Sequence, residues 1–513
     1  MADRLGTDPA YIAPNREEGG ISSMAVSNAQ GGKLYLYPYS ARDENRKTWS
    51  FMSLSHRGGK KYKEGRDAEG NDIFQKHSKE TQVEADQRKG RSSVLNYCRF
   101  FIDRFHGYVT RKNVSRVTSE KDEEWQTFLA DATGRGESLD AFIQRWKKMA
   151  LTKSPYWARL DTPSVEARSL ADQKRLKIRP TASLLDPENV FDYDEDWRTG
   201  ILTRIVVRDE ARIKESAMAA ERTEVRYTEW TKDTWERWIQ EGDVEADVQG
   251  RVSVRPDKKG THVWGRVPYE RLDFSNPTDA KNQVFSESMI HDIADWQRDI
   301  FRIFSLLLEE WFNRTFSTMV IAGARPEEIS SQMGSMLLAI VNPQAKVYPT
   351  GADSRQAESL LVGLKFLITN LFRSAQFEAS GDPAETRTNQ SGTKVARDLE
   401  GLYQVLAAFS GAAEIAENRL IELWKVMSKR ESLDVARSDH PNDFDVQTIV
   451  EDVELIAEQE LANFPKAFLA EQIRQVIGRQ RPNLPEAVKR AVEAELEAFV
   501  TAVEPAEPTN AGA

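Results

Sequence analysis

One uninterrupted helical pattern constrains this chain more than any other feature. From 391 to 427 apolar residues recur every three or four positions, which lays a single stripe along a helix; its members are Leu402, Leu406, Phe409, Ala413, Ala416, Leu420, Trp424 and Met427. A helix over 392–427 would be about 54 Å long. Ordinary helices average about 11–12 residues, so this length requires a structural reason.

The middle of this predicted helix carries very small side chains in the stretch "AAFSGAA". Small residues let a neighbouring helix approach closely, and glycine beside serine is a known kink site. A coiled-coil rod is the alternative, but its heptad pattern does not survive "FSGAA". The sequence therefore favours a helix that a neighbouring helix can approach closely or that bends at its centre.

Two further strongly apolar helices are predicted at 286–316 and 354–377. The first has a stripe wide enough to be buried on more than one side. Between them lies an insert, 317–353, in which "TMVIAG" and "KVYPT" resemble strands around a helical middle. The pattern predicts an antiparallel helix pair that carries a small α/β insert away from the main body.

The remaining chain divides by composition. Residues 1–90 are rich in glycine and charge and predict a partly disordered arm with short strands or turns. Its basic cluster (Arg57, Lys60, Lys61, Lys63 and Arg66) is interpreted as a solvated loop, with docking to protein or DNA as the alternative. Amphipathic helices are predicted within 92–152, with Ser138 as an N-cap, and antiparallel strands within 175–275. Residues 428–500 are predicted helical, and 501–513 disordered.

Composition limits the classes of function. The 513 residues suffice for two or three domains, and the formal net charge of −10 argues against a protein that grips nucleic acid over its whole surface. One cysteine and six scattered histidines exclude multi-cysteine metal sites and histidine pairs at helical ligand spacing. Phosphate-binding loops, nucleophile elbows, a secretory signal and membrane-length apolar runs are not found. We expect a soluble, non-secreted protein without a cofactor or metal, and not an enzyme.

The stretch "DPENVFDYDEDW" is the one acidic constellation, with Asp186, Glu188, Asp192, Asp194 and Asp196 among its members. Its alternation resembles a calcium loop, but Trp197 stands where glycine is needed and Thr203 where glutamate is needed. A solvated turn between strands is the favoured interpretation. A weak cation site and a two-metal nuclease centre stay open as alternatives.

The order of segments resembles the portal proteins of tailed double-stranded-DNA bacteriophages. The resemblance rests on "NYCRFFIDRFHGYVTRKNV", "ATGRGESLDAFIQRWKKMAL", "RPTASLLDPENVFDYDEDW", "HVWGRVPYERLDF" and the long helix from "SGTKVARDLEG" to "AENRLIELW". Together these cover about 91–427. The first ninety residues depart from the family pattern.

The resemblance implies an α+β, mostly helical protomer. Its regions would be an N-terminal arm (1–90), a wing (91–285), a two-helix stem (286–316 and 354–377), a clip (317–353), a tunnel loop (378–391), the long helix (392–427), a helical crown (428–500) and a tail (501–513).

The function that the resemblance implies is a homo-oligomeric ring, twelve-fold in the capsid, at one vertex of the virion. Double-stranded DNA would pass through the channel during packaging and ejection. The partners would be the large terminase, major capsid and scaffolding proteins and head–tail adaptor proteins, with assembly in the host cytoplasm and no membrane. The alternatives are a metal-dependent phage DNA nuclease using 186–196, or another structural ring component of the virion.

Three sets of residues are candidates for these roles. In a loop of ~14 residues, uncharged polar side chains such as Thr386, Asn389 and Gln390 can contact a passing phosphate backbone without binding it tightly. The whole tunnel-loop set is Glu378, Asp382, Thr386, Arg387, Asn389 and Gln390. The clip set, for terminase and adaptor docking, is Arg325, Glu327, Glu328, Gln332 and Lys346. The subunit-packing set is Trp296, Phe304, Trp311, Ala408 and Gly411.

Overall fold

The computed structural model describes most of the chain. The described residues are 34–39, 42–112, 114–116, 122–162, 179–196, 198–214, 216, 218, 220–241, 251–274, 287–315, 318–322, 346–350, 354–375, 392–433, 437–441, 444, 466–480 and 486–501. The chain divides into two compact units, one made of Met1–Arg42 with Asn189–Val267 and the other of Asp43–Glu188 with Pro268–Ala513. The fold class is α+β, as the sequence predicts.

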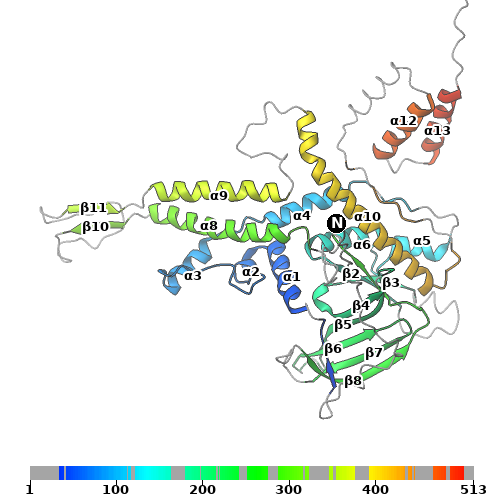
Figure 1. Ribbon diagram of the computed structural model, residues 1–513, viewed down its shortest axis with the longest axis horizontal. Coiled ribbons are helices and arrows are strands. Elements are labelled where there is room, and N and C mark those ends of the chain that lie inside the picture. The colour runs from blue at the N-terminus through cyan, green and yellow to red at the C-terminus, as the bar shows by residue number, and fades with distance from the viewer. Residues whose placement is uncertain are drawn as a thin grey trace, which may run out of the picture. The chain divides into compact units, whose positions relative to one another are not determined.

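The first unit is built on a six-stranded antiparallel sheet (Figure 1), in the order β1-β8-β7-β6-β5-β4. Its strands are β1 (Leu34–Leu36), β4 (Val190–Asp196), β5 (Ile201–Ile213), β6 (Arg222–Trp230), β7 (Thr234–Gln240) and β8 (Val252–Thr261). Side chains on alternate positions form its core, where the rings of Phe191 and Tyr227 meet edge to face at 4.8 Å. The sequence assigned 91–285 to one region, whereas this sheet forms a unit of its own.

The second unit combines helices with a three-stranded antiparallel sheet, β3-β2-β9. The strands are β2 (Tyr156–Asp161), β3 (Thr181–Leu185) and β9 (Tyr269–Leu272). The helices before and among them are α4 (Tyr97–Val109), α5 (Glu123–Ala130) and α6 (Leu139–Thr152). Ser138 accepts a hydrogen bond from the backbone N–H of Ala141, which confirms the predicted N-cap.

The long helix is α10 (Gly392–Met427), a continuous element of 36 residues that matches the prediction. It packs against α4, β2 and β9. Its predicted apolar stripe is buried. Phe409 contacts Phe105 and Phe274 (ring centroids 6.1 and 5.6 Å), and Trp424 contacts Trp125 at 5.1 Å. The helix is therefore the spine of the second unit.

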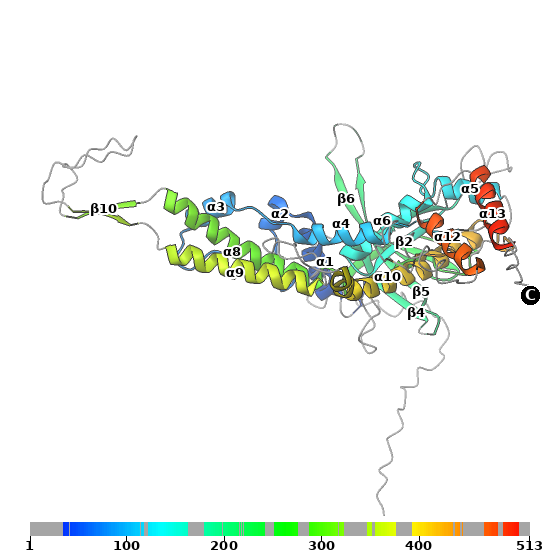
Figure 2. The ribbon, with the colours of Figure 1, turned by 90° about the horizontal axis from the view of Figure 1, so that it is seen from above.

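The helix pair and the two strands of its insert are also present, while the predicted helical middle of the insert lies outside the described residues. Helix α8 (His291–Thr315) and helix α9 (Ser354–Ser374) lie side by side in both ribbon views (Figures 1 and 2). After α8 the chain enters β10 (Thr318–Ala322), which pairs antiparallel with β11 (Lys346–Thr350) directly before α9. Helix α8 begins at His291, a turn later than predicted, and α9 ends at Ser374. The C-terminal region contains α12 (Lys466–Gln480) and α13 (Glu486–Thr501), which contact one another.

Although β1 and the turns within 64–81 agree with the prediction of short strands and turns for 1–90, that prediction is wrong for most of 42–90. This part contains three helices, α1 (Arg42–Arg57), α2 (Gly59–Lys63) and α3 (Gln82–Arg91), and the basic cluster lies partly on α2. Trp49, Phe51 and Tyr62 are buried in this part of the second unit. The apolar side chains are few but large, so a polar composition concealed a packed region.

Candidate functional site

The two loop-borne candidate sets lie mainly outside the described residues. This holds for the whole tunnel-loop set, Glu378, Asp382, Thr386, Arg387, Asn389 and Gln390, and for the clip residues Arg325, Glu327, Glu328 and Gln332. Lys346 is the first residue of β11. The subunit-packing set lies on α8 and α10, and these helices, with α9, form the candidate site.

Helix α9 has apolar side chains on two opposite faces. Ala357, Leu364 and Leu371 are buried and recur every seven residues, so they share one face. Val362 and Phe366 lie about 180° away, at one helical turn from each other, and their exposed fractions are 67% and 65%. An amphipathic helix of a monomer would have polar residues on that second face.

The apolar stripe of helix α8 changes from buried to exposed along the helix. Its apolar stripe is buried over Ile293, Ile300 and Leu307 and becomes exposed one turn later, at Trp311 (47%). Trp296 and Phe304, the other predicted packing residues on this helix, are half-buried. Large apolar surface is therefore concentrated at the end of α8 that leads into β10.

The two predicted packing residues on α10 lie on its outer face. Ala408 is exposed, and a Cβ atom added to Gly411 would meet nothing within 4 Å. Ile415, one turn after Gly411, is 58% exposed. As far as the described residues show, this strip of α10 is exposed and available to another helix or chain.

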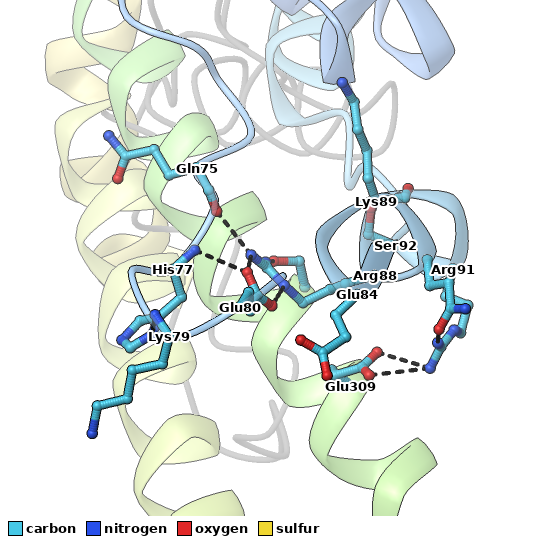
Figure 3. A network of polar contacts seen from close by, with 12 residues as sticks. Gln75, His77, Lys79, Glu80, Glu84, Arg88, Lys89, Arg91, Ser92 and Glu309 are labelled. Carbon is cyan, nitrogen blue, oxygen red and sulfur yellow. Dashed lines mark hydrogen bonds and ion pairs between the residues drawn. The ribbon is translucent and has the colours of Figure 1, made fainter. Parts of the chain in front are cut away.

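Helix α3 braces the outer half of α8 through a buried arginine (Figure 3). The Arg88 side chain is 4% exposed and donates from Nη1 to the Ser305 hydroxyl at 2.8 Å. Its Nε and Nη2 donate to the two carboxylate oxygens of Glu80 at 2.7 and 2.9 Å, and Nη2 also donates to the carbonyl of Gln75 at 2.8 Å. The hydrogen bond from Arg88 holds the pKa of Glu80 below its ordinary value.

A second arginine of α3 acts one turn further along α8. Arg91 donates from Nη1 to both carboxylate oxygens of Glu309, at 3.2 and 2.9 Å (Figure 3). Its guanidinium also lies 4.0 Å from the ring centroid of Phe312, a cation–π distance. These contacts fix the end of α8 on which the exposed Trp311 lies.

The inner half of α8 is fixed by a buried amide. Gln297 is fully buried, donates from Nε2 to the Ser55 carbonyl at 3.0 Å and accepts at Oε1 from the Cys98 N–H at 2.9 Å. It thereby joins α8 to α1 and α4. On the neighbouring helix, Phe372 of α9 packs against Phe101 of α4 at 5.1 Å between ring centroids. The helix pair is rooted in the core of the second unit.

The acidic stretch 186–196 is mostly a paired strand, contrary to the predicted solvated turn. Asp192 and Asp194 lie on β4, and the guanidinium of Arg204 on β5 pairs with both of them. Asp186 and Glu188, which belong to the second unit, pair with the ammonium of Lys153 at 2.8 and 2.6 Å. Burial raises the pKa of Asp192. Among the described residues, no cluster of three or more His, Cys, Asp or Glu has an arrangement that would hold a metal ion.

Several buried charged groups were not found by sequence reasoning, among them Glu417. Glu417 on α10 is fully buried and contacts His440 and Arg116. A glutamate inside the apolar stripe of a long helix was the available signal, because a buried carboxylate needs partners. Its partners come from distant segments and were not predictable from local pattern.

Comparisons with known proteins add a weak structural similarity. The chain matches no protein-family model, and no curated protein sequence matches it. Among solved structures, a chain of "Virion of native gene transfer agent (GTA) particle" is similar, with a TM-score of 0.39 and 12% identity. The match covers 87% of this chain and 97% of that chain. A TM-score this low does not establish a shared fold.

In the part of the chain that the structure describes, none of the helices combines the length and the apolar character that crossing a bilayer requires.

Proposed function

We propose that this chain is the repeating protomer of a portal ring, a homo-oligomer at one capsid vertex through which double-stranded DNA is packaged and ejected. The observation that carries the proposal is the α8–α9 pair, rooted in the second unit, joined beyond α8 by the β10–β11 hairpin and apolar on outward faces. The segment order of the sequence resembles portal proteins and supports the same proposal. A virion location follows from this function.

The outward apolar faces suit a heterologous contact between identical protomers. In a ring, one surface of each protomer meets a different surface of the next, so two unlike faces must both be left open in the single chain. Val362 and Phe366 on α9 offer large side chains, whereas the outer face of α10 at Ala408 and Gly411 offers room for close approach. Burial of such side chains would stabilise the ring by about 1.5–3 kcal/mol for each large residue.

The remaining roles follow from the same ring. The polar segment 378–391 would line the channel and meet phosphates without reading bases. The segment between α8 and α9 would dock the large terminase during packaging and adaptor proteins afterwards, while the capsid and scaffolding proteins would contact the ring from outside. The protomer would have no catalytic role of its own and would need no cofactor or metal.

Electron microscopy of the purified full-length chain tests the proposal. We expect negative-stain images of annuli with a central channel, and mass photometry peaks at a high multiple of the 58.3 kDa protomer, with twelve as the expected subunit number in the capsid. Monomers or dimers without annuli at micromolar concentration would contradict the proposal.

A paired variant makes this test specific to the helix pair. Replacing both Val362 and Phe366 by Asp should raise the concentration needed for half-assembly by roughly tenfold or more, because charges would be buried without partners. The matched control replaces Val83 and Met218, exposed fractions 66% and 97%, by Asp, which adds the same charge elsewhere. Equal assembly of both variants would argue against the α9 face as the contact.

The nuclease alternative makes a different prediction. It requires cleavage of plasmid DNA that depends on magnesium and is lost in the variants Asp192→Ala and Asp194→Ala. In the structure these two carboxylates already have Arg204 as their counter-ion. Under the ring proposal we expect no such cleavage by the wild-type chain.

A further inference from the structure

Residues 437–441 form a short strap that is held along α10 by polar contacts. The backbone N–H groups of Ser115 and Asp439 each donate to the carbonyl of the other, at 3.0 and 2.9 Å. Asn418 of α10 accepts at Oδ1 from the Ser438 N–H at 2.8 Å, and the Ser410 hydroxyl donates to the Pro441 carbonyl at 2.7 Å. Hydrogen bonds with Ser115, Asn418 and Ser410 thus hold the strap in place.

His440 is the centre of this attachment. Its ring is fully buried, as is the carboxylate of Glu417, and Nε2 lies 2.8 Å from Glu417 Oε2. On the other side, Nδ1 lies 2.9 Å from Nζ of Lys147 on α6, a lysine that is itself 2% exposed. The histidine thus bridges a buried anion and a buried cation that belong to different helices.

Glu417 and Lys147 together determine which protonation state of the His440 ring fits between them. A carboxylate only accepts hydrogen bonds and an ammonium group only donates them. Nε2 of His440 must therefore carry a hydrogen toward Glu417, and Nδ1 must offer its lone pair to Lys147. Both contacts are satisfied only by the neutral ring. A second proton on Nδ1 would place an N–H against the N–H groups of the Lys147 ammonium.

Further charged groups surround the histidine. Arg116 donates from Nε to Glu417 and pairs through Nη1 with Asp140 of α6. The neutral ring leaves Lys147 and Arg116 balanced by Glu417 and Asp140. Glu414 of α10 accepts from the backbone N–H of His440 at 3.2 Å, and Asp439 beside it is exposed.

The pKa shifts of His440 and Lys147 agree with this geometry. Burial lowers the pKa of His440 from its ordinary value, and Lys147 lowers it further against the opposing effect of Glu417. Burial lowers the pKa of Lys147 to about 8, so its ammonium form predominates at and below neutral pH. Both groups therefore remain in the fitting states near pH 7.

We propose that His440 is a proton-operated latch that keeps strap 437–441 on α10 while its ring is neutral and releases the strap when the ring is protonated. The direction of the pH effect follows from proton linkage. A histidine with a lowered pKa in the attached state contributes stability above its ordinary pKa of 6.5 and loses that contribution as the pH falls. Lys147 stays protonated over this range, and pH 5 lies above the ordinary pKa of the carboxylates. The inference does not depend on the proposed ring.

Hydrogen–deuterium exchange of the full-length chain tests the latch. The amides of Asp439 and His440 should exchange about tenfold faster at pH 5.5 than at pH 7.5 after correction for intrinsic rates, because the released ring gains one proton with an ordinary pKa of 6.5. Peptides from the α10 segment around Phe409, which is buried against α4, should keep their protection. Strap amides with unchanged corrected protection across this range would overturn the proposal.

Two variants and one control separate the latch from general acid loosening. His440→Gln has no titrating ring, so its strap should exchange independently of pH between 7.5 and 5.5. Lys147→Met removes the ammonium that opposes the second proton, so the strap should hold to lower pH than in the wild type. This second variant keeps the test decisive if His440→Gln does not fold. His106→Gln, at a half-buried histidine that contacts α6 through the Gln144 carbonyl, should leave the wild-type response unchanged. A wild-type pH response in both His440→Gln and Lys147→Met would refute the latch.

Discussion

Arg88 and Ser305 lie 217 positions apart in the chain, and the guanidinium of the first donates to the hydroxyl of the second at 2.8 Å. This contact fastens α3, in a region that the sequence assigned to an arm, onto the helix pair. It lies beside the bidentate pair of Arg88 with Glu80, and the guanidinium also lies 4.3 Å from the ring centroid of Phe74. Arginine here combines ionic, hydrogen-bonding and stacking contacts that lysine cannot reproduce together.

Arg88→Met should loosen α3 from α8. The change leaves the Glu80 carboxylate without its cation, and loss of one partner of a buried pair costs about 3–5 kcal/mol, less here because Glu80 retains some solvent. We expect faster amide exchange throughout α3 and a lower thermal midpoint by circular dichroism. Arg66→Met is the control, since Arg66 is 74% exposed in its side chain and its pair with Asp72 contributes little.

The attachment of α3 should also depend on pH in the acid range. Because the hydrogen bond from Arg88 lowers the pKa of Glu80 below 4.5, its contribution to stability is present above pH 4.5 and is lost as the pH falls further. Exchange of α3 amides should therefore accelerate from pH 5 to pH 3.5 relative to intrinsic rates. In Arg88→Met that acceleration should be smaller, with a remainder from Glu84 of the α3 capping box, whose pKa is also lowered, and an unchanged acceleration would contradict the assignment to Glu80.

Trp424→Ala should be among the most damaging single changes in α10. The indole is buried between Trp125 and Phe128, with ring centroids 5.1 and 5.3 Å away, and truncation of a buried tryptophan costs about 3–5 kcal/mol. The expected result is a lower denaturation midpoint in urea, followed by circular dichroism. Met218→Ala, at a side chain 97% exposed, should leave the midpoint within experimental error.

Two glycines should respond in opposite directions to alanine. A Cβ on Gly260 would lie 2.7 Å from Nε1 of Trp235, so Gly260→Ala should destabilise the six-stranded sheet by about 1–3 kcal/mol. A Cβ on Gly363 in α9 would meet nothing within 4 Å, and Gly363→Ala should stabilise by about 0.5–1 kcal/mol. Thermal unfolding of both variants beside the wild type checks the two signs, and equal shifts would contradict the steric argument.

The elements predicted correctly are those with a strong periodic signal. The 36-residue α10, the α8–α9 pair and the β10–β11 hairpin each follow from regular spacing of apolar or β-branched residues. Helices α1 to α3 were missed because a few large residues, such as Trp49 and Phe51, bury enough surface to order a polar segment. Local composition does not reveal how much area three or four aromatic rings bury.

The buried polar contacts around α10 could not be predicted from the sequence for a related reason. Glu417 meets Arg116 from 301 positions away, and Lys147 meets His440 from 293. The spacing of α10 places Glu417 beside a buried stripe but does not name its partners. The outward face of α9 was partly foreseeable, since the sequence predicted a strongly apolar helix at 354–377, yet only the packing of Leu364 and Leu371 identifies which side is exposed.

Gln297 has a consequence for how the helix pair responds to its surroundings. Its amide carries no charge, so the junction of α8 with Ser55 and Cys98 is insensitive to ionic strength and to protonation. The arginine contacts further along α8 are ionic and weaken as salt screens them. The attachment of the outer end of α8 through Arg91 and Glu309 should therefore weaken with salt, whereas its junction with Ser55 and Cys98 should not.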